Sequence, residues 1–157
     1  SKGFKNLAQN TAHFGFSLLI LSILFNSLFS SEIITNLKVG QTFENSKTKI
    51  VFESLSQKEG ENYKSIIGNF IVQDSKGKIE NLSPELRIYN QPNITTSEAD
   101  IKTTLLSDKF IVINLVQNQE FFNVRYQVKP FMLWIWISVI LISFGGLISF
   151  IKKEYEK

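Results

Sequence analysis

Two long apolar runs bracket the chain, and alternating apolar and polar positions fill the stretch between them. No charged residue occurs at positions 14–29 or 131–151, where most residues are Leu, Ile or Phe. A helix needs about 20 consecutive apolar residues to cross a bilayer. The pattern therefore predicts five segments: an N-terminal segment at 1–10, a transmembrane helix at 11–30, a β-rich domain at 31–130, a second transmembrane helix at 131–151 and a tail at 152–157.

The middle segment has the patterning of short β-strands. Runs rich in Ile, Val, Phe and Tyr predict strands at 49–55, 63–73, 86–89, 110–116 and 121–128. Polar turns separate them at 58–62, 74–78 and 117–120, and the stretch 93–106 fits either a helical turn or a strand. Strands at this spacing predict a small antiparallel barrel or sandwich. The fold class is therefore a membrane protein of the α+β type, with two transmembrane helices flanking an extracytoplasmic β domain.

Charge sets the predicted topology. Lys2 and Lys5 precede the first apolar run, and Lys152, Lys153 and Lys157 follow the second. Because positive residues near membrane helices stay on the cytoplasmic side, both termini are expected there or in the mitochondrial matrix. The β domain is then periplasmic, or lies in the intermembrane space. Trp134 and Trp136 fit the aromatic belt at the start of the second helix, and Gly145-Gly146 fits a close helix contact.

The amino-acid composition argues against several classes of function for this chain. The net charge is +3, but residues 31–130 carry twelve basic and twelve acidic side chains and are neutral as a segment, which argues against nucleic-acid binding. The chain has no cysteine, which excludes disulfides, cysteine zinc sites and thiol chemistry from its own residues. It begins with Ser1 and enters an apolar run that lacks a cleavage site, so we expect a piece of a longer polypeptide.

His13, the single histidine, stands at the mouth of the first apolar run. An ionisable group there is costly unless it meets a partner, and imidazole is the commonest nitrogen ligand of metals and haem iron. On a helix it shares a stripe that suits a face turned toward other helices, formed by His13, Ser17, Ile20, Leu24 and Ser27. Physical chemistry alone leaves three roles open: a haem or metal ligand, a proton carrier, or a structural hydrogen-bonding group.

The β domain offers few rival sites. It has no histidine and no cysteine, which excludes Ser-His and Cys-His nucleophile pairs. The acidic pairs Glu59 with Glu61 and Glu98 with Asp100 lie in polar surroundings, so a solvated face is the better interpretation.

Several motifs in fixed order resemble the C-terminal part of CcmF, the cytochrome c-type biogenesis protein of the haem lyase complex. They are Thr11-Ala12-His13-Phe14-Gly15, Glu61-Asn62-Tyr63, Leu82-Ser83-Pro84-Glu85-Leu86-Arg87-Ile88-Tyr89, Thr96-Ser97-Glu98-Ala99-Asp100-Ile101, and Arg125-Tyr126-Gln127-Val128-Lys129-Pro130-Phe131-Met132-Leu133-Trp134-Ile135-Trp136 with Gly145-Gly146. The resemblance covers nearly the whole chain.

The resemblance implies a specific role. Proteins of this family attach haem to apocytochrome c outside the membrane and hold a haem b through two transmembrane histidines, of which His13 matches the second. Expected partners are the rest of the haem lyase, other cytochrome c maturation proteins, a haem chaperone, apocytochrome c and the lipid bilayer. The expected location is the inner (plasma) membrane of a bacterium or the mitochondrial inner membrane. The internal haem would transfer electrons to the incoming haem iron.

The family's tryptophan-rich segment, its external histidines and its first haem b ligand have no counterpart here, so the chain by itself is not expected to catalyse haem attachment. Arg87 and Arg125 are candidates for haem propionates, although an ion pair with Glu85 or another acid is the better interpretation. Two other hypotheses stay open: a membrane-tethered scaffold without its own cofactor, and an anchored sensor or binding protein.

Overall fold

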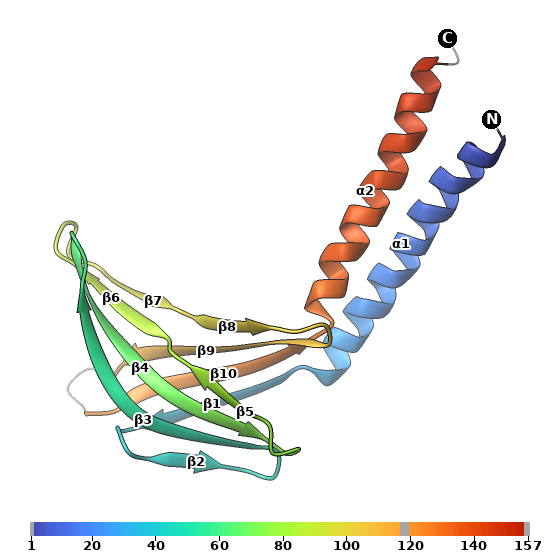
Figure 1. Ribbon diagram of the computed structural model, residues 1–157. Helices are drawn as coiled ribbons and strands as arrows, with labels where there is room; N and C mark the ends of the chain where they lie inside the picture. The colour runs from blue at the N-terminus through green and yellow to red at the C-terminus, as the bar shows by residue number, and fades with distance from the viewer. Residues whose placement is uncertain (1, 117–119, 156–157) are drawn as a thin grey trace. The chain divides into compact units, whose positions relative to one another are not determined.

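The computed structural model describes residues 2–116 and 120–155, and it divides them into two compact units. One unit contains the two helices, α1 (Lys2–Phe29) and α2 (Met132–Tyr155), together with residues 103–108. The other is a β domain (Figure 1). The strands are β1 (Ser31–Leu37), β2 (Thr42–Glu44), β3 (Thr48–Glu59), β4 (Tyr63–Asp74), β5 (Ile79–Leu82), β6 (Glu85–Tyr89), β7 (Thr95–Glu98), β8 (Asp100–Thr103), β9 (Ser107–Leu115) and β10 (Phe122–Pro130).

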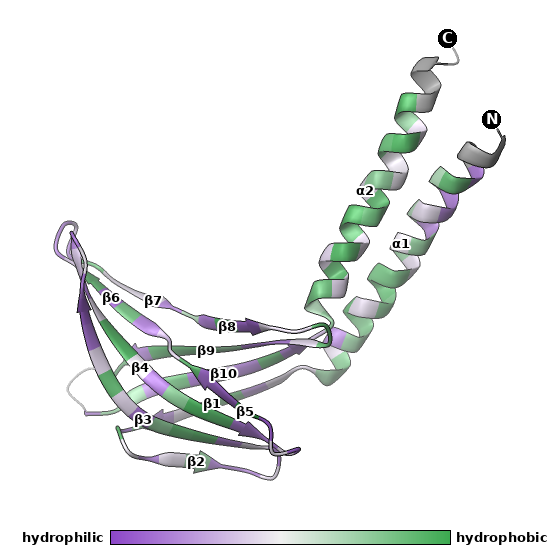
Figure 2. Cartoon of the chain, viewed as in Figure 1, coloured by the Kyte–Doolittle hydropathy of each residue, from purple (hydrophilic) through white to green (hydrophobic). Residues whose placement is uncertain are grey.

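The strands form two sheets that make a sandwich. One sheet has the order β1-β10-β9-β8, and the other has the order β2-β3-β4-β6-β7, with β5 paired to β4. The paired strands run antiparallel. β3 and β4, for example, pair from Thr48↔Asp74 to Glu59↔Lys64. Both sheets alternate apolar and polar positions (Figure 2), which is the pattern that gives each sheet one buried face. The predicted antiparallel β domain is confirmed, in its sandwich form.

The core lies between the two sheets. Phe52 of β3 stacks on Phe70 of β4 at 4.3 Å between ring centroids, and it meets Phe122 of the opposite sheet edge-on at 5.6 Å. Offset and edge-on geometries are the favoured arrangements of aromatic pairs. The remaining buried core residues are Leu37, Ile50, Val72, Leu82, Leu86, Ile111, Ile113, Val124 and Tyr126. They recur at every second position because side chains alternate between the faces of a strand.

The five predicted strands correspond to β3, β4, β6, β9 and β10, and the ambiguous stretch 93–106 contains the strands β7 and β8. The predicted turn at 58–62 is shorter, because Lys58 and Glu59 still pair with β4. Strands β1, β2 and β5 were not predicted. β1 and β2 lie at sheet edges, where little of the strand is buried and the alternation is weak. Residues 117–119 of the last predicted turn lie outside the described residues.

The two helices lie side by side, and the chain termini are at the same end of the pair (Figure 1). Residues Asn6–Phe29 and Met132–Ile151 are long and apolar enough to cross a membrane, by length and composition. The helix α1 begins at Lys2, earlier than the predicted start near residue 7 or 11, because the polar residues before the apolar run also accept helical geometry. The topology prediction depends on five lysines whose side chains lie outside the described residues: Lys2, Lys5, Lys152, Lys153 and Lys157.

The step from β10 into α2 depends on Phe131. Its φ of 60° places the backbone in the left-handed region, which is costly for a bulky residue. Three contacts hold it there: its N–H donates to Leu106 O at 2.9 Å, its carbonyl accepts from Ile135 N at 3.2 Å, and its ring stacks on Phe25 at 5.1 Å. Asn26 Nδ2 also donates to Pro130 O at 2.6 Å. These contacts fix where the second helix begins.

A buried ion-pair cluster joins the two sheets. Glu80 of β5 forms two ion pairs: Oε2 lies 3.0 Å from Lys109 Nζ of β9, and Oε1 lies 2.8 Å from Lys78 Nζ. The Glu80 and Lys109 side chains are only 11% and 13% exposed. Burial raises the pKa of the Glu80 carboxyl, but hydrogen bonds from Lys78 and Lys109 outweigh it and hold the pKa below its usual value. Asp74, 3.8 Å from Lys109, also has a lowered pKa: burial raises it, and hydrogen bonds from backbone N–H groups outweigh that effect.

Because the folded-state pKa of Glu80 is lowered, its stabilising contribution is present above the unfolded-state pKa and is lost as the pH falls through the folded-state value. We predict that Glu80→Gln lowers the free energy of unfolding of the β domain by about 1–3 kcal/mol at neutral pH. The difference from wild type should shrink as the pH falls below about 4.3, the pKa of an unperturbed glutamate, and should be lost once the pH is below the lowered folded-state pKa. Denaturant unfolding of the chain in detergent, followed by β-sheet circular dichroism, measures this.

The matched control is Glu44→Gln, which removes an exposed pair 3.3 Å from Lys49. Exposed pairs contribute little, so this variant should unfold almost as wild type does at every pH. A Glu80→Gln difference that stays constant from neutral to acidic pH would contradict the assignment.

Candidate helix-pair site

Small buried residues at heptad spacing form the contact between α1 and α2. On α1, Ala8, Gly15 and Ser22 are buried and lie seven residues apart, and on α2, Ser138 and Gly145 are buried with the same spacing. Small residues let membrane helices approach closely, and a seven-residue repeat keeps one seam facing the partner helix. The sequence therefore specifies a tight antiparallel helix pair.

The backbones almost touch at the two glycines. A Cβ atom added at Gly145 would lie 2.8 Å from Ala12 N and 2.9 Å from Ala8 O, and one added at Gly15 would lie 3.0 Å from Ile142 N. Nothing lies within 4 Å of the corresponding position at Gly146. The predicted close approach at Gly145-Gly146 is therefore made by Gly145 alone.

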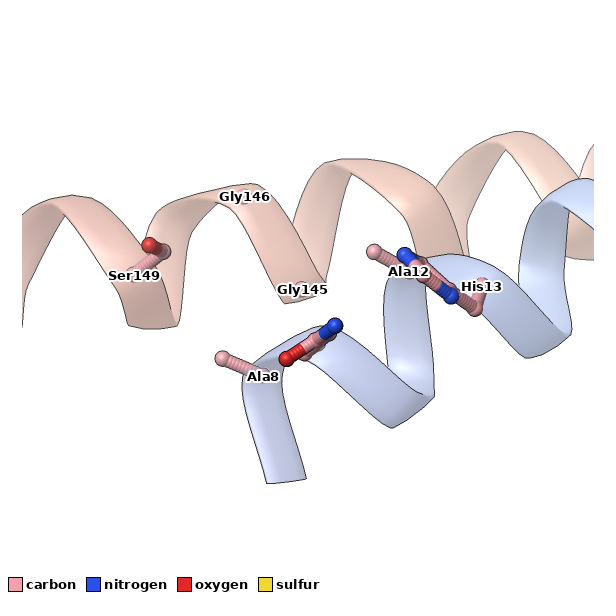
Figure 3. Close-up of a pocket in the computed structure, with 7 residues that line it drawn as sticks. Ala8, Ala12, His13, Gly145, Gly146 and Ser149 are labelled. Atoms are coloured by element: carbon pink, nitrogen blue, oxygen red, sulfur yellow. The ribbon is translucent and has the colours of Figure 1, made fainter. Parts of the chain in front are cut away.

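A groove of about 390 Å³ runs beside this contact (Figure 3). Its lining residues come from both helices and are mostly small: Ala8, Gln9, Ala12, His13, Gly145, Gly146 and Ser149. Because five of these seven side chains are Ala, Gly or Ser, there is space for an apolar group against the helix backbones. His13 is the one lining residue with a nitrogen that ligates metals.

The His13 side chain is exposed at the edge of this groove. Within the described residues, neither ring nitrogen takes part in a hydrogen bond or an ion pair; the backbone carbonyl of His13 accepts from Ser17 Oγ at 3.0 Å. The described residues also contain no group of three or more His, Asp or Glu side chains that could hold a metal ion. The His13 ring can therefore supply one ligand to a metal or cofactor that other residues also hold.

The stripe that contains His13 does not face α2. Its five members, His13, Ser17, Ile20, Leu24 and Ser27, are all exposed. The predicted contact of this stripe with other helices is not made with α2, because the small residues allow closer packing on a different face. Among the apolar residues elsewhere on α1, Phe14 and Leu21 are exposed, and Leu18 and Phe25 are half-buried.

The two arginines that were candidates for haem propionates form ion pairs with acidic side chains. Arg87 Nε lies 3.1 Å from Glu85 Oε2, and Arg125 Nε lies 3.1 Å from Glu32 Oε1. Burial raises the pKa of Glu85, but hydrogen bonds from Ser65 and Arg87 lower it below its usual value. The structural ion-pair interpretation of Arg87 and Arg125 is confirmed in these contacts.

Sequence reasoning recognised His13 and Gly145 but missed Ala8, Gly15 and Ser22 as the contact face. The signal was available as a repeat of small residues at seven-residue spacing. Trp134 is half-buried and donates from Nε1 to Leu105 O at 2.7 Å, while Trp136 is 62% exposed. Both positions fit the predicted aromatic belt.

Comparison with known proteins places the chain in context. A family model described as the CcmF C-terminal beta-sandwich matches residues 28–130. The chain is 28% identical over 145 residues to the cytochrome c-type biogenesis protein CcmF of Pseudomonas aeruginosa, covering 92% of this chain and 22% of that protein. It is 31% identical over 145 residues to the cytochrome c-type biogenesis protein ccl1 of Rhodobacter capsulatus, with the same coverage.

A solved structure of the cytochrome c heme lyase CcmF has a similar fold. The TM-score is 0.70 at 16% sequence identity, and the match covers 94% of this chain and 25% of the solved chain. The chain thus spans about a fifth of the length of its curated relatives and a quarter of the solved one.

The helix contact gives a paired prediction. Gly145→Ala should destabilise the helix pair by about 1–3 kcal/mol, because the new methyl group meets the α1 backbone. Gly146→Ala has the same chemistry in open space and should leave the pair unchanged or slightly more stable, since Ala favours helix over Gly. Titration of the detergent-solubilised chain with a denaturing detergent, followed by Trp134 and Trp136 fluorescence, measures both. Equal effects would contradict the contact.

Proposed function

Because this chain belongs to the family of the CcmF C-terminal β-sandwich, we propose that it works as the C-terminal portion of a haem lyase component in cytochrome c maturation, with His13 supplying one axial ligand to an intramembrane haem b. The observation that carries the proposal is the exposed His13 ring at the edge of a groove lined by small residues of two apolar helices.

The residues present fit half of such a site. A single imidazole provides one axial position, and the groove walls around Ala12 and Gly145 leave room for a flat apolar group. A second ligand would come from residues outside this chain, which spans about a fifth of its relatives' length. The five-residue exposed stripe around His13 is the face of α1 that α2 does not cover, so it is available to further membrane helices.

The rest of the helix pair positions the ligand. The close approach of Ala8 and Ala12 to Gly145 fixes α1 against α2 directly beside His13, and the stacked Phe25 and Phe131 rings fix the other end of the pair. A histidine on a rigid helix keeps its geometry when a ligand binds. A haem bound there would supply one-electron transfer to the maturation reaction. The chain's own contribution would be to hold the iron through His13.

We further propose that the β-sandwich meets the other parts of the lyase, the haem chaperone and apocytochrome c, as part of a cytochrome c maturation assembly. The names of the relatives, which are cytochrome c-type biogenesis proteins, support the general process. The location that follows is an inner (plasma) membrane, or the mitochondrial inner membrane, with the β domain on the periplasmic or intermembrane side.

This topology has a direct test. A reporter that is active only outside the cytoplasm, inserted after Gly60 in the turn between β3 and β4, should be active, while the same reporter after Lys157 should be inactive. A reporter active only in the cytoplasm should give the opposite pair of results. Cytoplasmic activity of the insertion at Gly60 would overturn the proposed orientation.

The haem ligand is tested by His13→Ala in the chain co-expressed with the upstream part of its lyase. Removal of an axial ligand should reduce the bound low-spin haem b at least about tenfold, as measured by the reduced-minus-oxidised absorption spectrum of purified protein. Leu28→Ala changes an exposed residue of the same helix that lies outside the groove, and it should leave the spectrum unchanged. Equal protein yields of the two variants exclude misfolding, and an unchanged spectrum in His13→Ala would rule out ligation.

A further inference from the structure

The turn between β8 and β9 carries two exposed leucines. Leu105 is 69% exposed and Leu106 is 68% exposed, more than any other large apolar side chain in the described part of the molecule. Thr104 and Ser107 close the turn: Thr104 N donates to Ser107 O at 3.0 Å, and Thr104 Oγ1 both donates to Ser107 O and accepts from Ser107 N. Tight turns favour Gly, Asn and Asp at their tips. The turn itself therefore gives no reason for two leucines.

The first turn of α2 holds this tip. Leu106 O accepts from Phe131 N at 2.9 Å, and Leu105 O accepts from Trp134 Nε1 at 2.7 Å. The apolar span of α2 begins at Met132. The two hydrogen bonds therefore hold both leucines beside the start of that span. Trp136, 62% exposed, lies within the same first turns. Tryptophans concentrate at the headgroup level of a bilayer.

The backbone of the turn is suited to the headgroup level of a bilayer. The carbonyls of Leu105 and Leu106 both have hydrogen-bond donors, and the N–H groups of Thr104 and Ser107 both have acceptors. Within the described residues, the N–H groups of Leu105 and Leu106 have no acceptor. Because unpaired backbone groups are costly in hydrocarbon, these two N–H groups suit a depth at which water and headgroup oxygens are still present. The exposed surface of the tip is then aliphatic, without the aromatic or arginine anchors that mark protein-binding hot spots.

We infer that Leu105 and Leu106 insert into the bilayer at the headgroup–acyl boundary, on the side of the membrane that holds the β domain. This inference rests on the proposed membrane topology. The tip would add a third point of membrane contact beside the two helices, and it would fix the depth of the start of α2 through the hydrogen bonds to Phe131 and Trp134. Aliphatic side chains that leave water for the acyl region provide the driving force.

The absence of cysteine makes the test site-specific. Leu106→Cys in the otherwise unchanged chain is labelled with a small fluorophore and reconstituted into vesicles that contain lipids spin-labelled at a shallow or a deep acyl position. We expect the shallow lipid to quench the Leu106 label at least about twofold more than the deep lipid does. Phe144→Cys, 57% exposed within the apolar span, is the membrane reference and should be quenched by the deep lipid. Ile79→Cys, an apolar residue 61% exposed in the β domain, should be quenched by neither lipid.

Each outcome decides one question. Quenching at Phe144 without quenching at Leu106 overturns the insertion of the turn and leaves the proposed topology standing. Absence of quenching at Phe144 overturns the topology and this inference together. A Leu106 label that is protected from aqueous iodide but unaffected by either spin-labelled lipid would mean that a protein surface covers the turn, which also overturns the inference. Leu105→Cys, tested in parallel, shows whether a single substitution has disturbed the tip.

Discussion

The close approach of two helix backbones is the constraint on which the helical unit depends. At Gly145 there is no space for even a methyl group between α2 and the Ala12 backbone, and Gly15 is nearly as tight against Ile142. In lipid, no hydrophobic driving force holds helices together, so close packing must supply the attraction. The seven-residue repeat of small residues provides that packing along one seam. The groove beside His13 exists because the same small residues line it.

A second set of contacts operates at the other end of the helix pair. The β10 strand must become a helix within one residue, and Phe131 takes a left-handed conformation to allow this. Its cost is offset by stacking on Phe25 and by a hydrogen bond to Leu106 O. Asn26, a polar residue inside an apolar run, is used to bind the Pro130 carbonyl. Polar and strained groups thus occur where the chain leaves one regular element for another.

Under the proposed function, His13 supplies half of a site. One imidazole would give one axial bond, and the described residues contain no group of three or more His, Asp or Glu side chains that could hold a metal ion. In this proposal the other ligand comes from another part of the assembly; the chain spans about a fifth of its relatives' length. The β-sandwich needs no such completion for its own core, because its aromatic and aliphatic residues are enclosed by the two sheets. Stability and chemistry therefore reside in different units of the chain.

The sequence by itself determined the two apolar spans, the central strands and the family, because these depend on local periodicity and on motifs such as Pro84-Glu85-Leu86-Arg87-Ile88-Tyr89. The tertiary structure alone decided which face of α1 meets α2, which of two adjacent glycines is in contact, and why β1 is a strand. Residues such as Gly145 and Gly146 are identical in composition and propensity and differ only in what lies opposite them. An edge strand such as β1 takes its conformation from hydrogen bonds to β10, more than ninety positions away in the register Ser31↔Val128, which local pattern does not encode.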